Sequence, residues 1–338
     1  MLPQNLLNDE ALVKELFDKA DPKSFFQIAE DSVTKSEIQD FLKASVEEGP
    51  EAAVNSLSDE LKARRATAII LTIGRPAILV KDNSFQVPIS DVWATRLNAS
   101  RANIETAIRA VGRVEVTNHP GGFSYVGTGW LVAPDVIVTN RHVAQAFSRK
   151  EGAEFVIKKN LISGTKIGVN LDFREEAGVD AQEQFDVLEI LYIEDDLDDK
   201  PDIAFLKIDT QARVGGVTVS LNATPITLAT TPPDDESEVA NIGYPAEDSR
   251  RNPLSDSKMD AIFGDIYDVK RLQPGQVKSV RNDLITHDCS TLGGNSGSVV
   301  LDFKTGVAIG LHFGGKFQVE NYAVPAAIIR DRMSKLGI

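Results

Sequence analysis

The chain has 338 residues, of which 42% are hydrophobic, 7% aromatic and 25% charged. This is ordinary globular composition, which excludes collagen-like, coiled-coil and wholly disordered classes. Lys and Arg number 36 against 50 Asp and Glu, so the formal net charge is −14. Because a surface of that sign repels phosphate backbones, we expect no nucleic-acid partner.

Cysteine usage and hydropathy indicate the compartment. Cys289 is the single cysteine, so no disulfide within the chain points to an oxidising environment. Asn8, Asp9 and Glu10 stand where a secretory signal would need a basic start and an apolar run. No stretch approaches the roughly 18 apolar residues of a membrane-spanning helix. We therefore expect a soluble, cytoplasmic protein without a membrane span.

Residues 1–65 have the periodicity of helices and predict a small all-α N-terminal domain. Thr34 and Glu37 stand in the positions of a capping box, and the Gly-Pro pair at 49–50 predicts the end of that helix. A bundle of this size is near the lower limit for independent folding. Apolar residues recur at helical spacing in three runs: after a predicted N-cap at Asn8, after Thr34, and at Val54, Leu57 and Leu61.

Residues 66–110 form a connector that we expect to pack on the region after it. The apolar runs 68–71 and 77–80, separated by a Gly-Arg-Pro sequence, predict two buried strands around a turn. Ser90 and Ser100 each precede a helical pattern and are predicted N-caps.

From residue 111 onwards, short apolar runs alternate with Gly, Pro, Asn and Asp, which is typical of β-strands. Without long helices between them, such runs favour a barrel or a sandwich over a parallel α/β sheet. The runs are 112–117, 123–133, 136–139, 155–158, 187–193, 203–208, 238–243, 276–280, 298–303, 307–313 and 320–324.

Three segments supply the hydroxyl, the base and the acid that nucleophilic catalysis needs. His142 follows two strand-like runs in TGWLVAPDVIVTNRHVA, Asp202 opens the apolar run in PDIAFLKI, and Ser296 lies in the glycine-rich TLGGNSGSVV. Gly293 and Gly294 permit turns that a Cβ would forbid, so the amides of Gly294 and Ser296 can converge as an oxyanion hole. Other acids compete with Asp202, which alone opens the strand directly: Asp195, Asp196, Asp198 and Asp199.

The order His, Asp, Ser and the contexts TNRHV, DIAFLK and GGNSGS resemble the trypsin-like (chymotrypsin-fold) serine proteases. DCSTLGGNSGS and GLHFGG are similar to the bacterial glutamyl endopeptidase-like group. The resemblance covers about residues 111–335 and implies a mainly β fold of two antiparallel six-stranded β-barrels. The expected organisation is a helical N-terminal domain at 1–65, the connector at 66–110 and a protease domain at 111–338.

The resemblance also implies the role of each candidate residue. Ser296 would be the nucleophile and His142 the general base and then acid, while Asp202 would orient the imidazole. His142 and Asp202 would come from the first barrel and Ser296 from the second.

The family position of the specificity pocket corresponds here to Thr291 and His312. Both can donate a hydrogen bond to a carboxylate, so we expect cleavage after Glu. Asp288 lies too far before the nucleophile to enter this pocket. Gly314 and Gly315 would present their backbone to a substrate strand.

No pattern predicts a cofactor or a metal. Residues 172–202 contain 13 acidic residues against two basic ones, but the run EDDLDD at 194–199 lacks the glycine spacing of an EF-hand loop. We interpret it as a solvated acidic loop. HExxH and phosphate-binding loops are absent from the sequence.

The sequence therefore predicts a serine endopeptidase that cleaves protein or peptide substrates through an acyl-enzyme. The N-terminal helices would control recruitment or activation, with a protein partner. The alternative is a latent protease-fold module that binds peptides or acts as a scaffold, which a serine-directed phosphonate probe would leave unlabelled. A third hypothesis is a chaperone-like housekeeping protease, which normally carries a C-terminal peptide-binding module.

Overall fold

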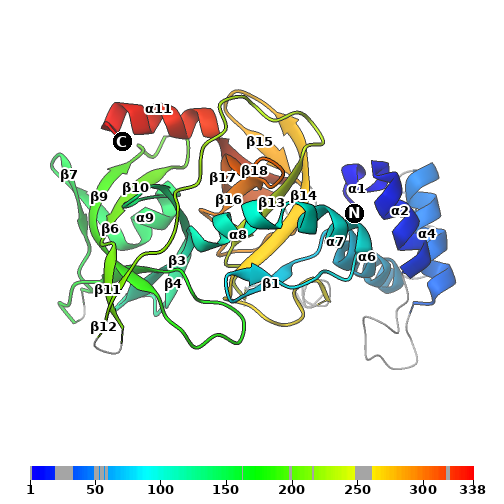
Figure 1. The fold of residues 1–338 in the computed structure, drawn as a ribbon, viewed down its shortest axis with the longest axis horizontal. Helices are drawn as coiled ribbons and strands as arrows, with labels where there is room; N and C mark the ends of the chain where they lie inside the picture. Colours follow the sequence, from blue (N-terminus) through cyan, green and yellow to red (C-terminus); the bar gives the residue numbers. More distant parts are fainter. Residues whose placement is uncertain are drawn as a thin grey trace.

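The computed structural model describes residues 2–19, 33–48, 53, 57, 60–161, 163–197, 200–214, 217–247, 261–316 and 320–338. Helices come first, followed by two β-barrels and a last helix (Figure 1). The N-terminal helices are α1 (Gln4–Asn8), α2 (Glu10–Lys19), α4 (Lys35–Glu47) and α6 (Glu60–Gly74).

Of the helix caps predicted in residues 1–65, the one at Thr34 is confirmed and the one at Asn8 is wrong. Thr34 forms the predicted capping box, since its side chain accepts from the backbone N–H of Glu37 and its own N–H donates to the Glu37 carboxylate. The predicted N-cap at Asn8 is wrong, because Asn8 ends α1 and Asp9 Oδ1 instead accepts from the N–H of Leu12 at 3.2 Å. The Gly-Pro pair at 49–50 and most of the third predicted helix fall outside the described residues.

The strand predicted at 68–71 is wrong, because these residues continue α6. Ala66, Ile69, Ile70 and Ile73 are buried and recur at helical spacing. A run of four apolar residues fits either a strand or a buried helix, so periodicity over so short a stretch does not decide between them.

The remainder of the predicted connector contains β1 (Ile78–Lys81), β2 (Ser84–Phe85), α7 (Asp91–Ala99) and α8 (Arg101–Arg109). β1 is the second strand predicted there. Ser90 caps α7 as predicted, accepting from the N–H of Trp93 at 3.1 Å, whereas the Ser100 side chain makes no cap bond to α8.

Six antiparallel strands close the first barrel in the order β10-β5-β4-β3-β8-β9. They are β3 (Val111–Thr117), β4 (Tyr125–Ala133), β5 (Val136–Thr139), β8 (Gly168–Asp172), β9 (Gln184–Ile193) and β10 (Ala204–Ile208). β8 was not predicted, because its sequence Gly-Val-Asn-Leu-Asp contains no apolar run.

The second barrel has the strand order β13-β16-β17-β18-β15-β14, and pairing of β13 with β14 closes it. Its strands are β13 (Glu238–Gly243), β14 (Arg271–Val280), β15 (Ile285–His287), β16 (Val299–Asp302), β17 (Val307–Lys316) and β18 (Glu320–Pro325). β1 pairs with β14 and so adds the N-terminal chain to this sheet. The predicted fold class, two six-stranded antiparallel barrels after N-terminal helices, is confirmed.

Smaller elements lie beside the barrels. They are the hairpins β6 (Ser148–Glu151) with β7 (Glu154–Ile157) and β11 (Gln211–Val214) with β12 (Val217–Ser220), and the helices α9 (Arg141–Phe147) and α11 (Ala326–Leu336). Among the described residues, no helix combines the length and the apolar character needed to span a membrane.

The N-terminal helices lie beside the second barrel, on the side away from the first (Figure 1). Asn5 Nδ2 donates to the carbonyl of Val277 in β14 at 2.8 Å, and Arg96 of α7 pairs with both Asp9 and Glu238 of β13. One cluster of buried apolar side chains runs from the helices through both barrels to Ile329. The helices therefore share a core with the barrels, while the domain boundaries at 65 and 110 stay predictions.

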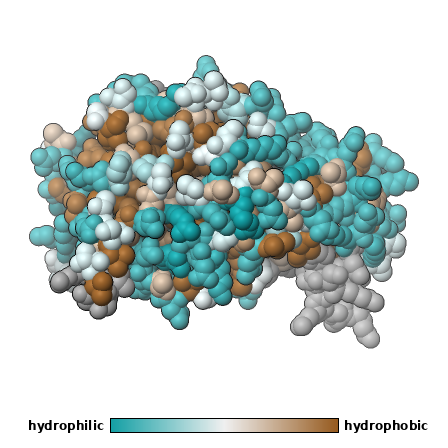
Figure 2. All heavy atoms as spheres, viewed as in Figure 1, coloured by the Kyte–Doolittle hydropathy of each residue, from teal (hydrophilic) through white to brown (hydrophobic). Residues whose placement is uncertain are grey.

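Most of the face seen in Figure 2 is hydrophilic, as the net charge of −14 leads one to expect. Hydrophobic residues on this face gather mainly on the half that carries the first barrel and α11.

Candidate active site

His142 and Asp202 meet because β5 and β10 are neighbours, with Ala204 paired to Thr139. A carboxylate only accepts hydrogen bonds, so His142 Nδ1–H donates to Asp202 Oδ2, at 2.5 Å, and the His142 backbone N–H donates to Oδ1 at 3.1 Å. Asn140 Nδ2 holds the Asp202 carbonyl at 2.9 Å. The imidazole is 47% exposed and the carboxylate 15%, so the histidine faces the solvent and the acid is shielded behind it.

Ser296 lies in the turn between β15 and β16, and Thr128 of β4 holds this turn from the other barrel. The Thr128 N–H donates to the carbonyl of Ser296 and its Oγ1 donates to the carbonyl of Gly294, each at 2.8 Å. Thr128 is fully buried. The serine turn is therefore bonded to the barrel that carries His142 and Asp202.

Two positions in this turn require glycine. Gly294 has φ +83° and Gly297 has φ +89°, in the left-handed region that a Cβ disfavours. A Cβ at 294 would collide with the carbonyl of Tyr244, and one at 297 with the carbonyl of Thr128.

The amides of Gly294 and Ser296, predicted as an oxyanion hole, are oriented by the carbonyls of their own peptide units. The Gly293 carbonyl accepts from the N–H of Ala246 at 2.5 Å, and the Asn295 carbonyl accepts from the N–H three residues later at 2.9 Å. In a trans peptide the N–H points opposite to the C=O, so both N–H groups are directed away from these contacts. In the described part of the chain neither amide has an acceptor.

His312, predicted for the specificity pocket, lies at an irregularity of β17 and is 2% exposed. Its Nδ1 is 3.2 Å from Nε2 of His287 in β15, a buried residue that no sequence motif singles out. Burial lowers the pKa of His287 to about 3. Burial, with further contributions from His287 and His142, holds the pKa of His312 well below its ordinary value. Both buried histidines are therefore neutral at pH 7.

Thr291 was also predicted for the pocket, but its hydroxyl hydrogen is used within the protein. Thr291 Oγ1 donates to Asn321 Oδ1 at 2.6 Å, and Asn321 Nδ2 donates to the carbonyl of Cys289 at 2.7 Å. The hydroxyl therefore braces the segment before the serine turn and keeps only its acceptor capacity free.

Gly314 and Gly315 lie on β17 and pair with Tyr322 and Asn321 of β18. On the opposite edge, β16 pairs with β17 only as far as Leu311. No other strand among the described residues covers that edge, and a Cβ on Gly314 would meet no atom within 4 Å. The backbone here has room for an added strand.

Comparison with known proteins identifies the family. The trypsin-like peptidase domain matches residues 127–311, more than half of the chain. The chain belongs to the trypsin-like serine peptidases. A probable serine protease of Lysobacter enzymogenes is 31% identical over 314 residues, which span 80% of this protease and 74% of that protein.

Two solved structures are also similar. A protease from M. tuberculosis in its active form is 17% identical, covers 71% of this protease and 86% of its own chain, and has a TM-score of 0.43. A serine endoprotease from Yersinia pestis is 18% identical, covers 70% and 66%, and has a TM-score of 0.44.

One group of carboxylates in the described part of the protease has the spacing of metal ligands. Oxygens of Glu115, Asp172 and Glu175 lie within 4.8 Å of one another. Arg113 Nη2 is 2.5 Å from Glu115 and 3.2 Å from Glu175, and burial raises the pKa of both glutamates. The guanidinium already supplies positive charge to two of the three carboxylates, so we assign no metal here.

The acidic run 194–199, predicted to be a solvated loop, is exposed at residues 195–197, but its first residue is buried and paired. Glu194 is 6% exposed and bonds Arg332 of α11 at 2.5 Å. Arg141, next to the catalytic histidine candidate, donates to the carbonyl of Asp195 at 2.8 Å and pairs with Asp196 at 3.1 Å. Residues 198–199 lie outside the described part of the chain.

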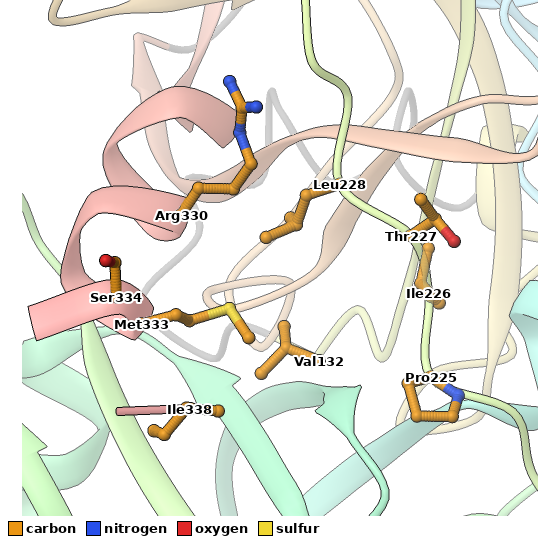
Figure 3. A pocket seen from close by; sticks show the side chains of 9 residues that line it. All are labelled: Val132, Pro225, Ile226, Thr227, Leu228, Arg330, Met333, Ser334 and Ile338. Atoms are coloured by element: carbon orange, nitrogen blue, oxygen red, sulfur yellow. The ribbon is translucent and has the colours of Figure 1, made fainter. Parts of the chain in front are cut away.

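A groove of about 420 Å³ lies between α11 and the segment that joins the barrels (Figure 3). Val132, Ile226, Leu228 and Met333 line it, with Arg330 at one side. It contains none of the candidate catalytic residues.

Sequence reasoning missed three residues that hold the site of the protease. Thr128 clamps the serine turn, His287 contacts His312, and Arg75 bonds Asp288. The motif around the serine gives no signal for them, because each acts on a segment remote in the sequence.

Proposed function

We propose that this protease is an endopeptidase in which Ser296 attacks the scissile carbonyl. The observation that carries the proposal is the hydrogen bond from His142 Nδ1 to Asp202. With its Nδ1 proton held there, His142 has Nε2 free to accept the serine proton and later to donate it to the leaving amine. The carboxylate stabilises the imidazolium that forms between the two steps.

Gly294 and Ser296 would bind the oxyanion of the tetrahedral intermediate through their backbone amides. The fixed peptide orientations and the absence of a described acceptor support this role. A latent scaffold would have no use for two backbone donors held without an acceptor in this turn, so they support the active enzyme.

The specificity we propose is cleavage after Glu. If His287 donates from Nε2 to Nδ1 of His312, the Nε2–H of His312 is left as a donor for a substrate carboxylate. The buried Nδ1 of His287 has no hydrogen-bond partner among the described residues. We favour these tautomers because they leave only an unpaired acceptor at that atom, whereas the opposite pair would bury an unpaired N–H there. Gly314 and Gly315 would pair with the backbone of the substrate.

The first test is labelling by a serine-directed phosphonate, with Ser296→Ala as the control. Labelling of the wild type alone supports the endopeptidase, and an unlabelled wild type contradicts it. The second test is a peptide panel varied at the residue before the cleaved bond. We expect Glu to be favoured over Gln, and the ratio to fall in His312→Ala. A preference for Lys, Arg or Phe, or an unchanged Glu/Gln ratio in the variant, would remove the pocket assignment and leave the catalytic residues untouched.

The N-terminal helices are proposed to control recruitment or activation of the endopeptidase. Their shared core with the second barrel supports a direct influence on the site. The cytoplasmic location stays a prediction.

A further inference from the structure

The five residues 287–291, which lead into the serine turn, are each held from another part of the protein. On one side, His287 contacts His312, and Asn321 bonds both the carbonyl of Cys289 and the hydroxyl of Thr291. The remaining two residues, 288 and 290, share one partner residue, which binds one through its side chain and the other through its backbone. Asp288 also pairs with Gln276 of β14, whose N–H donates to Asp288 Oδ1 at 2.7 Å and whose carbonyl accepts from the Asp288 N–H at 3.1 Å.

The shared partner of residues 288 and 290 is Arg75, which follows α6 in the N-terminal part of the chain. Arg75 Nε and Nη2 bond the two carboxylate oxygens of Asp288, each at 2.8 Å, and Nη2 also bonds Gln276 Oε1 at 2.7 Å. The Arg75 carbonyl accepts from Ser290 Oγ at 2.7 Å. The guanidinium is fully buried and the Asp288 side chain is 2% exposed.

Arg75 is itself fixed by its surroundings. Its Nη1 bonds the carbonyl of Gly74 at 2.7 Å, and Trp93 Nε1 bonds the same carbonyl at 2.9 Å. The guanidinium carbon lies 5.8 Å from the centre of the Trp93 ring. A planar guanidinium held in this way fixes the position and the plane of the carboxylate through two parallel hydrogen bonds. A lysine ammonium, which acts as a point charge, does not fix that plane.

We propose that Arg75 is a positioning residue for the substrate pocket, through which the N-terminal region sets the place of segment 287–291. The inference rests on the proposed function, because it treats this segment as the wall of the pocket before Ser296. Arg75 does not touch the substrate. Its effect passes through Asp288 and Ser290 to the neighbouring His287 and Thr291.

The alternative is that Arg75 only neutralises a buried carboxylate, and the two roles separate experimentally. Arg75→Met leaves the buried Asp288 without a counter-charge, so both hypotheses predict that this variant is less stable than the wild type. Arg75→Met with Asp288→Asn removes both charges and keeps an acceptor for the Gln276 N–H, which bonds Asp288 Oδ1 at 2.7 Å, so stability should recover. It nevertheless leaves the segment without its Arg75 anchor. Arg75→Lys keeps the charge and loses the planar guanidinium. Arg101→Met is the control, since Arg101 bonds Glu105 and Asn98 within the N-terminal part of the chain and contacts neither Trp93 nor the segment.

The measurement uses the full chain and, for each variant, the thermal midpoint and kcat/KM over the varied peptide panel. Discrimination is the ratio between the best and second-best residue of the wild type, whichever they are. We expect it to fall about tenfold or more in the double variant and by less in Arg75→Lys, since misplacing a binding group by about 1 Å can cost about 100-fold. Phosphonate labelling of Ser296 should persist.

Discrimination within twofold of wild type in the folded double variant would overturn the proposal, as would an equal fall in Arg101→Met. A wild type that prefers a residue other than Glu would contradict only the Glu assignment. A wild type that neither cleaves nor is labelled would contradict the proposed function itself.

Discussion

In the first barrel, His142 and Asp202 extend from adjacent strand ends, and Asn140 of the same barrel completes their hydrogen bonds. In the second barrel, the turn of Ser296 is bonded by Thr128 from the first barrel, and the segment before it by Arg75 from the N-terminal chain. One half of the site is therefore built within a single barrel, and the other half depends on residues outside its own barrel. Substitutions distant from Ser296 should therefore affect catalysis mainly through the second barrel.

The largest effect should come from removing a member of either half. Ser296→Ala and His142→Ala should each lower kcat/KM by about 10³ or more, because the triad acts as a unit. The double variant should be no worse than the singles by more than a few-fold, and circular dichroism should be unchanged. Substantial activity in Ser296→Ala, or fully additive losses, would contradict the assignment.

The second-largest effect should be the loss of stability when the Arg75 side chain is removed. Arg75→Met should lower the free energy of unfolding by about 3–5 kcal/mol, because it leaves the buried Asp288 charge without a partner. Denaturant unfolding measures this, with Arg149→Met as the control, since Arg149 pairs with Glu151 at the surface and should cost under about 1 kcal/mol. Equal costs for the two variants would show that burial of the pair does not matter.

Loosening the contact between the barrels should have a smaller effect. Thr128→Val keeps the shape of the side chain but leaves the carbonyl of Gly294 without its buried donor, which should cost about 1–3 kcal/mol. Hydrolysis should fall with it, because the serine turn loses its anchor. Ser45→Ala removes a buried hydroxyl that bonds within α4, outside both barrels, and should change stability alone. Unchanged hydrolysis in Thr128→Val would contradict the role of this contact.

Acid should weaken the second barrel through its neutral histidines. His287 and His312 have lowered pKa values in the native state, so below about pH 6.5 the unfolded chain binds protons that the native chain excludes. Stability should therefore fall as the pH drops from 6.5 towards 5, by up to about 1.4 kcal/mol per pH unit for each histidine. Unfolding at several pH values measures the slope, and His287→Phe should flatten it. An unchanged slope would show that other groups are responsible.

Local signals in the sequence were sufficient for much of the fold and for the candidate residues. The alternating runs from residue 111 predicted most barrel strands, and the glycines around Ser296 predicted its turn, because turns and strand faces are set by neighbouring residues. The strand predicted at 68–71 was wrong because a short apolar run fits two structures, and only packing against the other helices selects the helix. β15 was missed because its three residues include polar Thr286 and His287.

The sequence by itself determined the order of the motifs, the glycine positions and the mainly β character of residues after 111, since these depend on backbone chemistry and short-range pattern. Only the tertiary structure decided that His142 bonds Asp202, that His312 is buried against His287, and that Thr291 is turned to Asn321. It also decided that Arg75 bonds a carboxylate 213 residues away in the sequence. A buried charge needs a counter-charge close to it in the folded protein, and the residues next to Arg75 or Asp288 in the sequence do not indicate which group that is.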